Sequence, residues 1–379
     1  MILALTLCLL PSLQDVGATE LDTSDAAVRE AVEGGLTYLL ESQNKDGSWG
    51  GVRNATFTSG FANPATYHCW TVGTTGLATL ALLELGSGTK AEAAVERGLD
   101  FLVANAVLTR PAEWDVDNVW GLVYGLDTLA KAVVHPRYLD TDRGQTLRAA
   151  AETMIDGLAK YVSPRGGWGY YASPNANWQP EWATSFTTAV GVVALVNARE
   201  AGLAVPDKLL AATVRSVERC RQPNGAYTYS VNVFPRHLAL ESINQVKGSL
   251  GRIQVCNYAL YRAGVELPDG AMEEGIEQFF KHHKFLDAGR NKPIPHEAYY
   301  AVAAYFYLFG HYYAAAVIDT LPEEQRARYG RLLRHEILKC RQKDGAFWDF
   351  WIASSTKPYG TAFSIMALAQ TIERWDGPQ

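Results

Sequence analysis

The segment Gln43-Asn-Lys-Asp-Gly-Ser-Trp49 recurs in related form at three later places in the chain. The later copies read Ser163-Pro-Arg-Gly-Gly-Trp168, Gln222-Pro-Asn-Gly-Ala-Tyr227 and Gln342-Lys-Asp-Gly-Ala-Phe347. The central glycines of successive copies lie 119, 59 and 120 residues apart, so one unit is about 60 residues long. Self-similarity at a fixed period indicates a repeat architecture. The spacing predicts six units, with this Gly-aromatic phrase absent from the second and the fifth.

Each unit is predicted to contain two helices of different character. The first has apolar residues at three- and four-residue spacing, as Val28, Leu36 and Leu39 illustrate, which indicates one buried face and one exposed face. The second is apolar on nearly every side. The first helices are predicted at Ala26–Ser42, Lys90–Ala104, Leu147–Val162, Asp207–Arg221, Met272–His283 and Glu323–Arg341. The second helices are predicted at Tyr67–Leu85, Asp115–Val133, Trp182–Glu200, Asn244–Ala263, Glu297–Thr320 and Tyr359–Arg374.

The two helix types together predict how the units are arranged. A helix that is apolar all round must be enclosed by other elements. An open solenoid would need polar capping units at its ends, and no unit here has that character. An inner ring of second helices inside an outer ring of first helices satisfies both patterns. We therefore predict an all-α (α/α)6 toroid over residues 26–379.

The N-terminal residues predict a leader outside this domain. An apolar run, Met1–Leu10, is followed by the small residues Val16-Gly17-Ala18, which is typical of a cleavable signal peptide. We predict a signal peptide at 1–18, a linker at 19–25 and an exported protein, periplasmic or secreted. No later segment has the pattern of a transmembrane helix. The later cysteines are predicted to be buried and unpaired; they are Cys69, Cys220, Cys256 and Cys340.

The charge and composition restrict the classes of partner. The formal net charge is −6 and the sequence has no block of Lys or Arg, which argues against nucleic-acid binding. A hydrophobic content of 48% describes a globular domain with a large core. The partner that the family resemblances below imply, and that composition alone does not, is a small hydrophobic (isoprenoid) molecule or a saccharide. The sequence leaves the oligomeric state open.

In such a ring, the N-termini of the inner helices converge on one opening and direct free N–H groups into it. The side chains near those helix starts are therefore the candidate site. Besides Asp115, Asp117 and Asn118, we assign to substrate binding His68, Trp70, Trp114, Trp120, Tyr124, Trp182, Glu241, Lys247, Glu297, Tyr300 and Tyr359. The plainer interpretation of any one carboxylate here is an ordinary helix cap.

The Gln-x-x-x-Gly-x-Trp phrase resembles the QW repeat of squalene–hopene cyclases and the related toroids of protein prenyltransferase β subunits, over essentially all of residues 26–375. Trp114-Asp-Val-Asp-Asn-Val-Trp120 resembles the Asp-x-Asp-Asp element of class II terpenoid cyclases. This resemblance implies that Asp117 is a general acid that protonates an alkene or epoxide, with Asp115 and Asn118 beside it. Asn118 stands where that family has a final aspartate, so this chain has one acid fewer.

Three other functions stay open at the level of sequence. Paired carboxylates among Asp115, Asp117, Glu181, Glu241 and Glu297 would also suit a secreted polysaccharide hydrolase or lyase. A toroid that only binds a ligand or partner would need no acid. The prenyltransferase resemblance would imply zinc, but no Asp-x-Cys pair occurs, and cysteine and histidine ligands at suitable spacing are few. We predict no metal and no cofactor.

Overall fold

The computed structural model describes residues 21–51, 64–171, 182–231, 241–290, 292–351, 356–375 and 377–378. The predicted signal peptide at 1–18 and the candidate carboxylate Glu181 lie outside these residues. No helix in the described ranges combines the length and the apolar character that a bilayer crossing requires.

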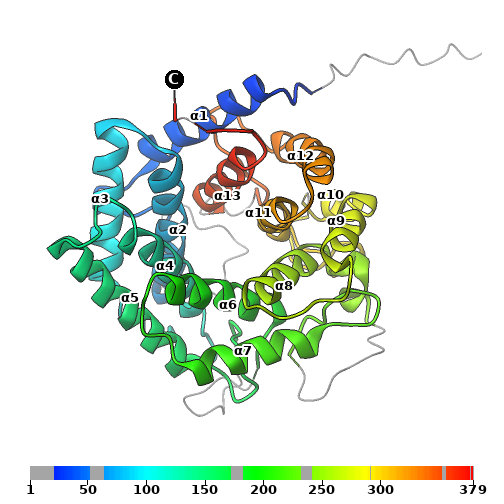
Figure 1. Cartoon of the computed structure of the whole chain (residues 1–379), viewed down its shortest axis with the longest axis horizontal. Helices are drawn as coiled ribbons and strands as arrows, with labels where there is room; N and C mark the ends of the chain where they lie inside the picture. Colours follow the sequence, from blue (N-terminus) through cyan, green and yellow to red (C-terminus); the bar gives the residue numbers. More distant parts are fainter. Residues whose placement is uncertain are drawn as a thin grey trace, which may run out of the picture.

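Helices form two concentric rings, as Figure 1 shows. The outer ring consists of α1 (Asp25–Ser42), α3 (Gly88–Ala104), α5 (Asp142–Tyr161), α7 (Asp207–Cys220), α9 (Ala271–Lys281) and α12 (Glu323–Leu338). The inner ring consists of α2 (Pro64–Leu85), α4 (Asn118–Val133), α6 (Ser185–Glu200), α8 (Leu250–Arg262), α11 (Phe306–Asp319) and α13 (Lys357–Ala369). Each inner helix packs on the next, and α13 packs on α2. The predicted closed, all-helical toroid is therefore confirmed.

The burial of each ring matches its sequence pattern. The inner helix α6 is buried from Ser185 to Ala198, on every side. The outer helix α7 buries one stripe, which includes Leu210, Val217 and Cys220, and exposes the rest. All four cysteines in the described chain are buried and none of them forms a disulfide, as predicted.

The repeated Gly-aromatic phrases attach each outer helix to an inner helix by the same contact. Their glycines, Gly47, Gly166, Gly225 and Gly345, all have φ between +80° and +88°, the left-handed region that a turn out of a helix requires. Two residues after each glycine, a buried aromatic residue donates its backbone N–H to an inner-helix hydroxyl. The pairs are Trp49 with Thr75 at 3.0 Å, Trp168 with Thr188 at 3.2 Å, Tyr227 with Ser249 at 3.3 Å and Phe347 with Thr361 at 2.9 Å.

The first and last units meet at a seam that closes the ring. Arg341 Nη1 lies 3.0 Å from Glu30 Oε1, and Arg334 Nη1 lies 2.6 Å from Asp25 Oδ1. The indole Nε1–H of Trp375 donates to the carbonyl oxygen of Leu85 at 2.9 Å. These contacts join the last unit to α1 and to the end of α2, which are the elements that an open superhelix would leave unpartnered.

Four predicted inner-helix starts were wrong, and for α4 and α6 the reason is that pairing with neighbouring segments replaces the first helical turns. The helix α4 begins at Asn118 instead of Asp115, because the backbone N–H of Val116 donates to Tyr170 O at 3.1 Å. The helix α6 begins at Ser185 instead of Trp182, since Ala183 O accepts from Val231 N–H. Two short 3-10 turns, Ser242–Asn244 and Val246–Gly248, precede α8, which begins at Leu250.

The fifth unit departs most from the prediction. The helix α11 begins at Phe306, nine residues after the predicted start at Glu297. The backbone of His296, Tyr300 and Ala301 has φ of +67°, +59° and +55°, which no α-helix accommodates. An extra short helix, α10 (Lys284–Arg290), follows α9 and was not predicted.

Candidate functional site

A cavity of about 390 Å³ lies among the inner helices and the segments that precede them. That size is at the small end of pockets that bind organic molecules, about 300–1,000 Å³. Its described lining is dominated by aromatic rings, namely Tyr67, Trp70, Trp120, Tyr124, Tyr170, Tyr171, Phe186, Tyr305, Phe306, Phe309, Phe350, Tyr359 and Phe363. Asp117 is the only carboxylate among the described residues of the lining.

Asp117 lies directly before α4 and is 5% exposed. Its backbone N–H donates to Asp115 Oδ1 at 2.9 Å, and Thr66 Oγ1 donates to Asp115 Oδ2. Burial, and next the negative charge of Asp115, raise the pKa of Asp117 well above its usual range, although hydrogen bonds from Trp70 and Trp120 oppose the shift. The geometry therefore holds Asp117 as a neutral acid that faces the cavity, supported from behind by a hydrogen-bonded Asp115.

Asn118 does not share this role. Its side chain is fully buried, its Nδ2–H donates to Leu108 O at 3.4 Å, and its Oδ1 has no hydrogen-bond partner. Neither Asn118 nor Asp115 is part of the cavity lining. The final position of the acidic element therefore points into the protein, away from the cavity that Asp117 faces.

The structure divides the other residues proposed for substrate binding into two groups. Trp70, Trp120, Tyr124 and Tyr359 line the cavity. The described lining does not include His68, Trp114, Trp182, Glu241, Lys247, Glu297 or Tyr300. Of the second group, His68, Glu241 and Glu297 are exposed.

Part of that second group forms an aromatic stack beside the cavity. Tyr171 lies between Trp114 and Trp182, with ring centroids 5.7 Å and 6.4 Å apart. Trp182 then stacks on Tyr229 at 6.3 Å. Lys247 is enclosed by rings, because its Nζ lies 3.3 Å from the Tyr300 hydroxyl and 5.4 Å from the Phe285 ring centroid.

A neutral histidine and a phenol form a second polar group of the cavity. His296 Nδ1–H donates to Ala301 O at 2.8 Å, so Nε2 carries the lone pair and accepts the Tyr305 O–H at 3.0 Å. Burial lowers the pKa of His296, which keeps the ring neutral. Tyr305 also hydrogen-bonds Tyr229, and the Tyr229 hydroxyl pairs closely with that of Tyr170.

The sequence pattern predicted that an inner helix begins at Glu297, directly after His296. The structure instead places His296 in a strained turn, with left-handed backbone at His296, Tyr300 and Ala301. Such strain costs about 1–3 kcal/mol per residue and concentrates at functional sites. Tyr170 and Tyr305 were not singled out, because only the folded chain joins the phrase of unit three to the start of α11.

No protein-family model and no curated protein matches this sequence. The structure is similar to an inactive α-1,6-mannanase variant of Salegentibacter in complex with α-1,6-mannotetrose (TM-score 0.59, 10% identity, 90% of this chain and 99% of that one). It is also similar to the unsaturated glucuronyl hydrolase of a Bacillus species (TM-score 0.60, 11% identity, 93% and 98%). A third match is a variant of the type II terpene cyclase MstE of Scytonema with geranylgeranyl dihydroxybenzoate (TM-score 0.53, 14% identity, 91% and 97%).

At these identities the similarity shows a common α/α toroid fold and no more. The toroid neighbours include a terpene cyclase and carbohydrate-active enzymes. One fold therefore hosts both chemistries, and the choice between them depends on the residues of this cavity.

Proposed function

We propose that this protein is a terpenoid-cyclase-like enzyme that cyclises or isomerises an isoprenoid by protonation. One observation carries the proposal: a cavity walled by aromatic rings contains a single described carboxylate, Asp117, and burial beside Asp115 raises the pKa of that carboxylate well above its usual range. A general acid must hold its proton before it can act. Asp117 transfers this proton to an alkene or epoxide of the substrate.

The wall of the cavity is suited to the positive charge that results. Protonation leaves a carbocation on the substrate and a carboxylate on Asp117. Trp70, Trp120 and Phe186 line the same cavity as Asp117. Aromatic faces attract cations, by about 2 kcal/mol or more where water is excluded. Asp115 accepts hydrogen bonds from Thr66 and from the Asp117 backbone, which hold it beside Asp117, where it raises the pKa of Asp117.

The reaction ends when the cation loses a proton. The Tyr305 oxygen lies in the cavity wall and donates its own proton to His296 Nε2. When the phenol oxygen accepts the substrate proton, its original proton passes to His296. This step leaves a neutral product, a protonated His296 and an ionised Asp117. His296 then releases its proton to solvent and Asp117 takes up one proton from solvent, which restores the enzyme.

Replacing Tyr305 with phenylalanine is expected to change the products more than the rate of substrate consumption. The share of the total product that is the alkene formed by the wild type should fall about tenfold or more. The reason is that a positioned proton acceptor speeds a proton transfer by about 10²–10⁴. Gas chromatography with mass spectrometry would measure the loss, together with alternative alkenes or alcohols formed by water capture. Tyr312→Phe on α11 is the matched control, because Tyr312 does not line the described cavity. An unchanged product ratio would remove Tyr305 from the termination step.

The carbohydrate alternative is less well supported by the same residues. A glycosidase generally needs two carboxyl groups that flank the scissile bond. Of the other described candidates, Glu241 and Glu297 are exposed and Asp115 is buried, and none of the three is part of the cavity lining. The similarity to carbohydrate-active toroids keeps this class as the direct competitor. Export remains a prediction from the leader.

The function can be tested with two substrate panels. Purified protein is incubated with C15 to C30 polyprenes and their terminal epoxides, and separately with α-mannan and unsaturated uronide oligosaccharides. We expect a cyclic product of the same mass as one polyprene and no new reducing ends. Release of reducing ends with every polyprene unchanged would overturn the proposal. A protein that binds a polyprene without converting it would support the non-catalytic alternative.

A further inference from the structure

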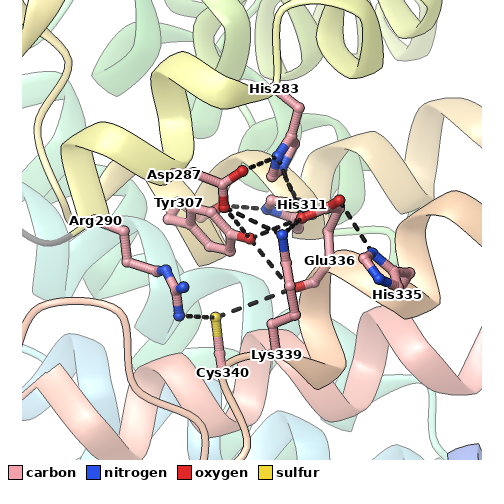
Figure 2. A network of polar contacts seen from close by, with 9 residues as sticks. All are labelled: His283, Asp287, Arg290, Tyr307, His311, His335, Glu336, Lys339 and Cys340. Atoms are coloured by element: carbon pink, nitrogen blue, oxygen red, sulfur yellow. Dashed lines mark hydrogen bonds and ion pairs between the residues drawn. The ribbon is translucent and has the colours of Figure 1, made fainter. Parts of the chain in front are cut away.

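A cluster of ionisable side chains lies between α10, α11 and α12, and Figure 2 shows it. His283 is the buried centre of the cluster, with 6% exposure. Its Nδ1 lies 3.0 Å from Asp287 Oδ2 on α10 and 3.2 Å from Glu336 Oε2 on α12. Three ligand-type atoms from two helices and the turn before α10 therefore face one point, all within 4.8 Å of one another.

The opposite side of His283 is held in one orientation. His283 Nε2 lies 3.0 Å from His311 Nε2, and His311 Nδ1 lies 2.6 Å from Tyr307 O. A backbone carbonyl only accepts, so His311 Nδ1 carries a hydrogen. A neutral imidazole with its hydrogen on Nδ1 has Nε2 as an acceptor. His283 Nε2 therefore carries the shared hydrogen, and Nδ1 is the nitrogen directed at the carboxylates.

The cluster already attracts a cation. Lys339 Nζ lies 3.3 Å from Asp287 Oδ1 and makes a close ion pair with Glu336 Oε2. The side chain of Lys339 is 30% exposed, whereas that of Glu336 is 16% exposed. The side chain of Asp287 is 35% exposed, so the ammonium and both carboxylates lie at the partly exposed edge of the cluster, in front of the buried His283.

We propose that His283 Nδ1, Asp287 and Glu336 form a binding site for a divalent transition metal of the zinc class, in competition with the Lys339 ammonium. Zinc binds histidine nitrogen and carboxylate oxygen at about 2.0–2.2 Å, so neighbouring ligands of a tetrahedral site lie about 3.3–3.6 Å apart. The spacings of 3.0 Å and 3.2 Å around His283 Nδ1 need only a small expansion. The His311 hydrogen bond is the outer partner that metal-binding histidines usually have.

This site is independent of the proposed reaction. None of its residues lines the described cavity. Asp287 belongs to the fifth unit and Glu336 to the sixth, so a bound ion would join two units of the ring. The expected consequence is a higher melting temperature in the presence of the ion, because a ligand that binds only the folded state stabilises it.

Zinc itself is the first probe. The full chain is treated with chelator, dialysed and titrated with Zn²⁺ by calorimetry. We expect one saturable site and a rise in melting temperature. Co²⁺ at the same site should give the visible absorption of a four-coordinate ion. The proposal is supported if one ion binds per chain, the melting temperature rises and bound Co²⁺ gives the four-coordinate absorption.

Substitutions locate the ion. His283→Gln and Glu336→Gln should lose the saturable site, and His311→Gln should weaken binding about 10–100-fold as an outer partner. Lys339→Met should tighten binding about tenfold or more, because the competing charge is gone. His282→Gln is the matched control, since His282 is adjacent in sequence and is not among the ligand atoms of the cluster.

Two results would overturn the proposal. One is a wild-type chain that binds no stoichiometric Zn²⁺. The other is a Glu336→Gln variant that binds Zn²⁺ as tightly as the wild type. Either result would leave an ion-pair network in which Lys339 is the permanent cation. If His283→Gln fails to fold by circular dichroism, Glu336→Gln and Lys339→Met decide the question, because both substitutions act at the partly exposed edge of the cluster.

Discussion

Replacing Asp117 with asparagine is expected to lower the turnover of an isoprenoid substrate by about 10²–10⁴, the usual contribution of a positioned general acid. The fold should survive, because asparagine keeps the shape of the side chain and removes a buried carboxyl group whose charge is unfavourable there. The measurement is product formation under single-turnover conditions, beside a thermal melt of the variant.

Asp127→Asn is the matched control for that experiment. Asp127 is also an aspartate of α4, and burial raises its pKa too, but it hydrogen-bonds Asn197 and does not line the described cavity. Turnover of this control should stay near that of the wild type. Full activity in Asp117→Asn, or an equal loss in both variants, would contradict the role of Asp117 as proton donor.

The pH dependence has a definite sign. Asp117 acts in its protonated form, so activity should be constant at low pH and should fall as pH rises through its raised native pKa. Stability follows the same direction. The contribution of Asp117 is fully present below the usual carboxyl pKa of 3.8 and is lost as pH rises through the raised value. The melting temperature of Asp117→Asn, relative to that of the wild type, should therefore rise with increasing pH.

Replacing Gly345 with alanine is expected to open the seam of the ring and to cost roughly 2–5 kcal/mol. The backbone φ of +82° costs an alanine about 1–2 kcal/mol. A Cβ there would lie 2.5 Å from Gly34 O and 2.8 Å from Gly34 C in α1, which adds about 1–3 kcal/mol of overpacking. Thermal or urea unfolding of the variant measures the sum.

Gly225→Ala separates the two contributions. Gly225 occupies the equivalent place in unit four with φ of +80°, but a Cβ there would meet nothing within 4 Å. It should lose only the backbone term of about 1–2 kcal/mol. Equal losses in the two variants would show that the close approach of Gly345 to α1 does not limit stability.

The repeat and its helices were predictable because local pattern controls them. The spacing of Gly47, Gly166, Gly225 and Gly345 indicated six units, and the all-round apolar second helices indicated an enclosed ring. The helix starts were less predictable, because Asp115 and Trp182 belong to segments that hydrogen-bond or stack with another unit. A single sequence window contains no information about such partners.

The candidate acid illustrates the same division. The residues around Asp117 identified it as a possible proton donor, but the separate fates of its neighbours Asp115 and Asn118 depend on Thr66 and Leu108, in other parts of the chain. The hydrogen bond between Tyr305 and His296 could not be predicted from the sequence. It depends on a left-handed turn at His296, in the region where a helix was expected to begin.

By itself, the sequence determined a six-unit helical ring and one acid at an inner-helix start, since periodicity and polarity are properties of neighbouring residues. The tertiary structure alone decided which side chains share the cavity and which ionisable groups meet behind it. Burial is the main cause of the raised pKa of Asp117, ahead of the charge of its sequence neighbour Asp115, and that burial exists only once the ring has closed.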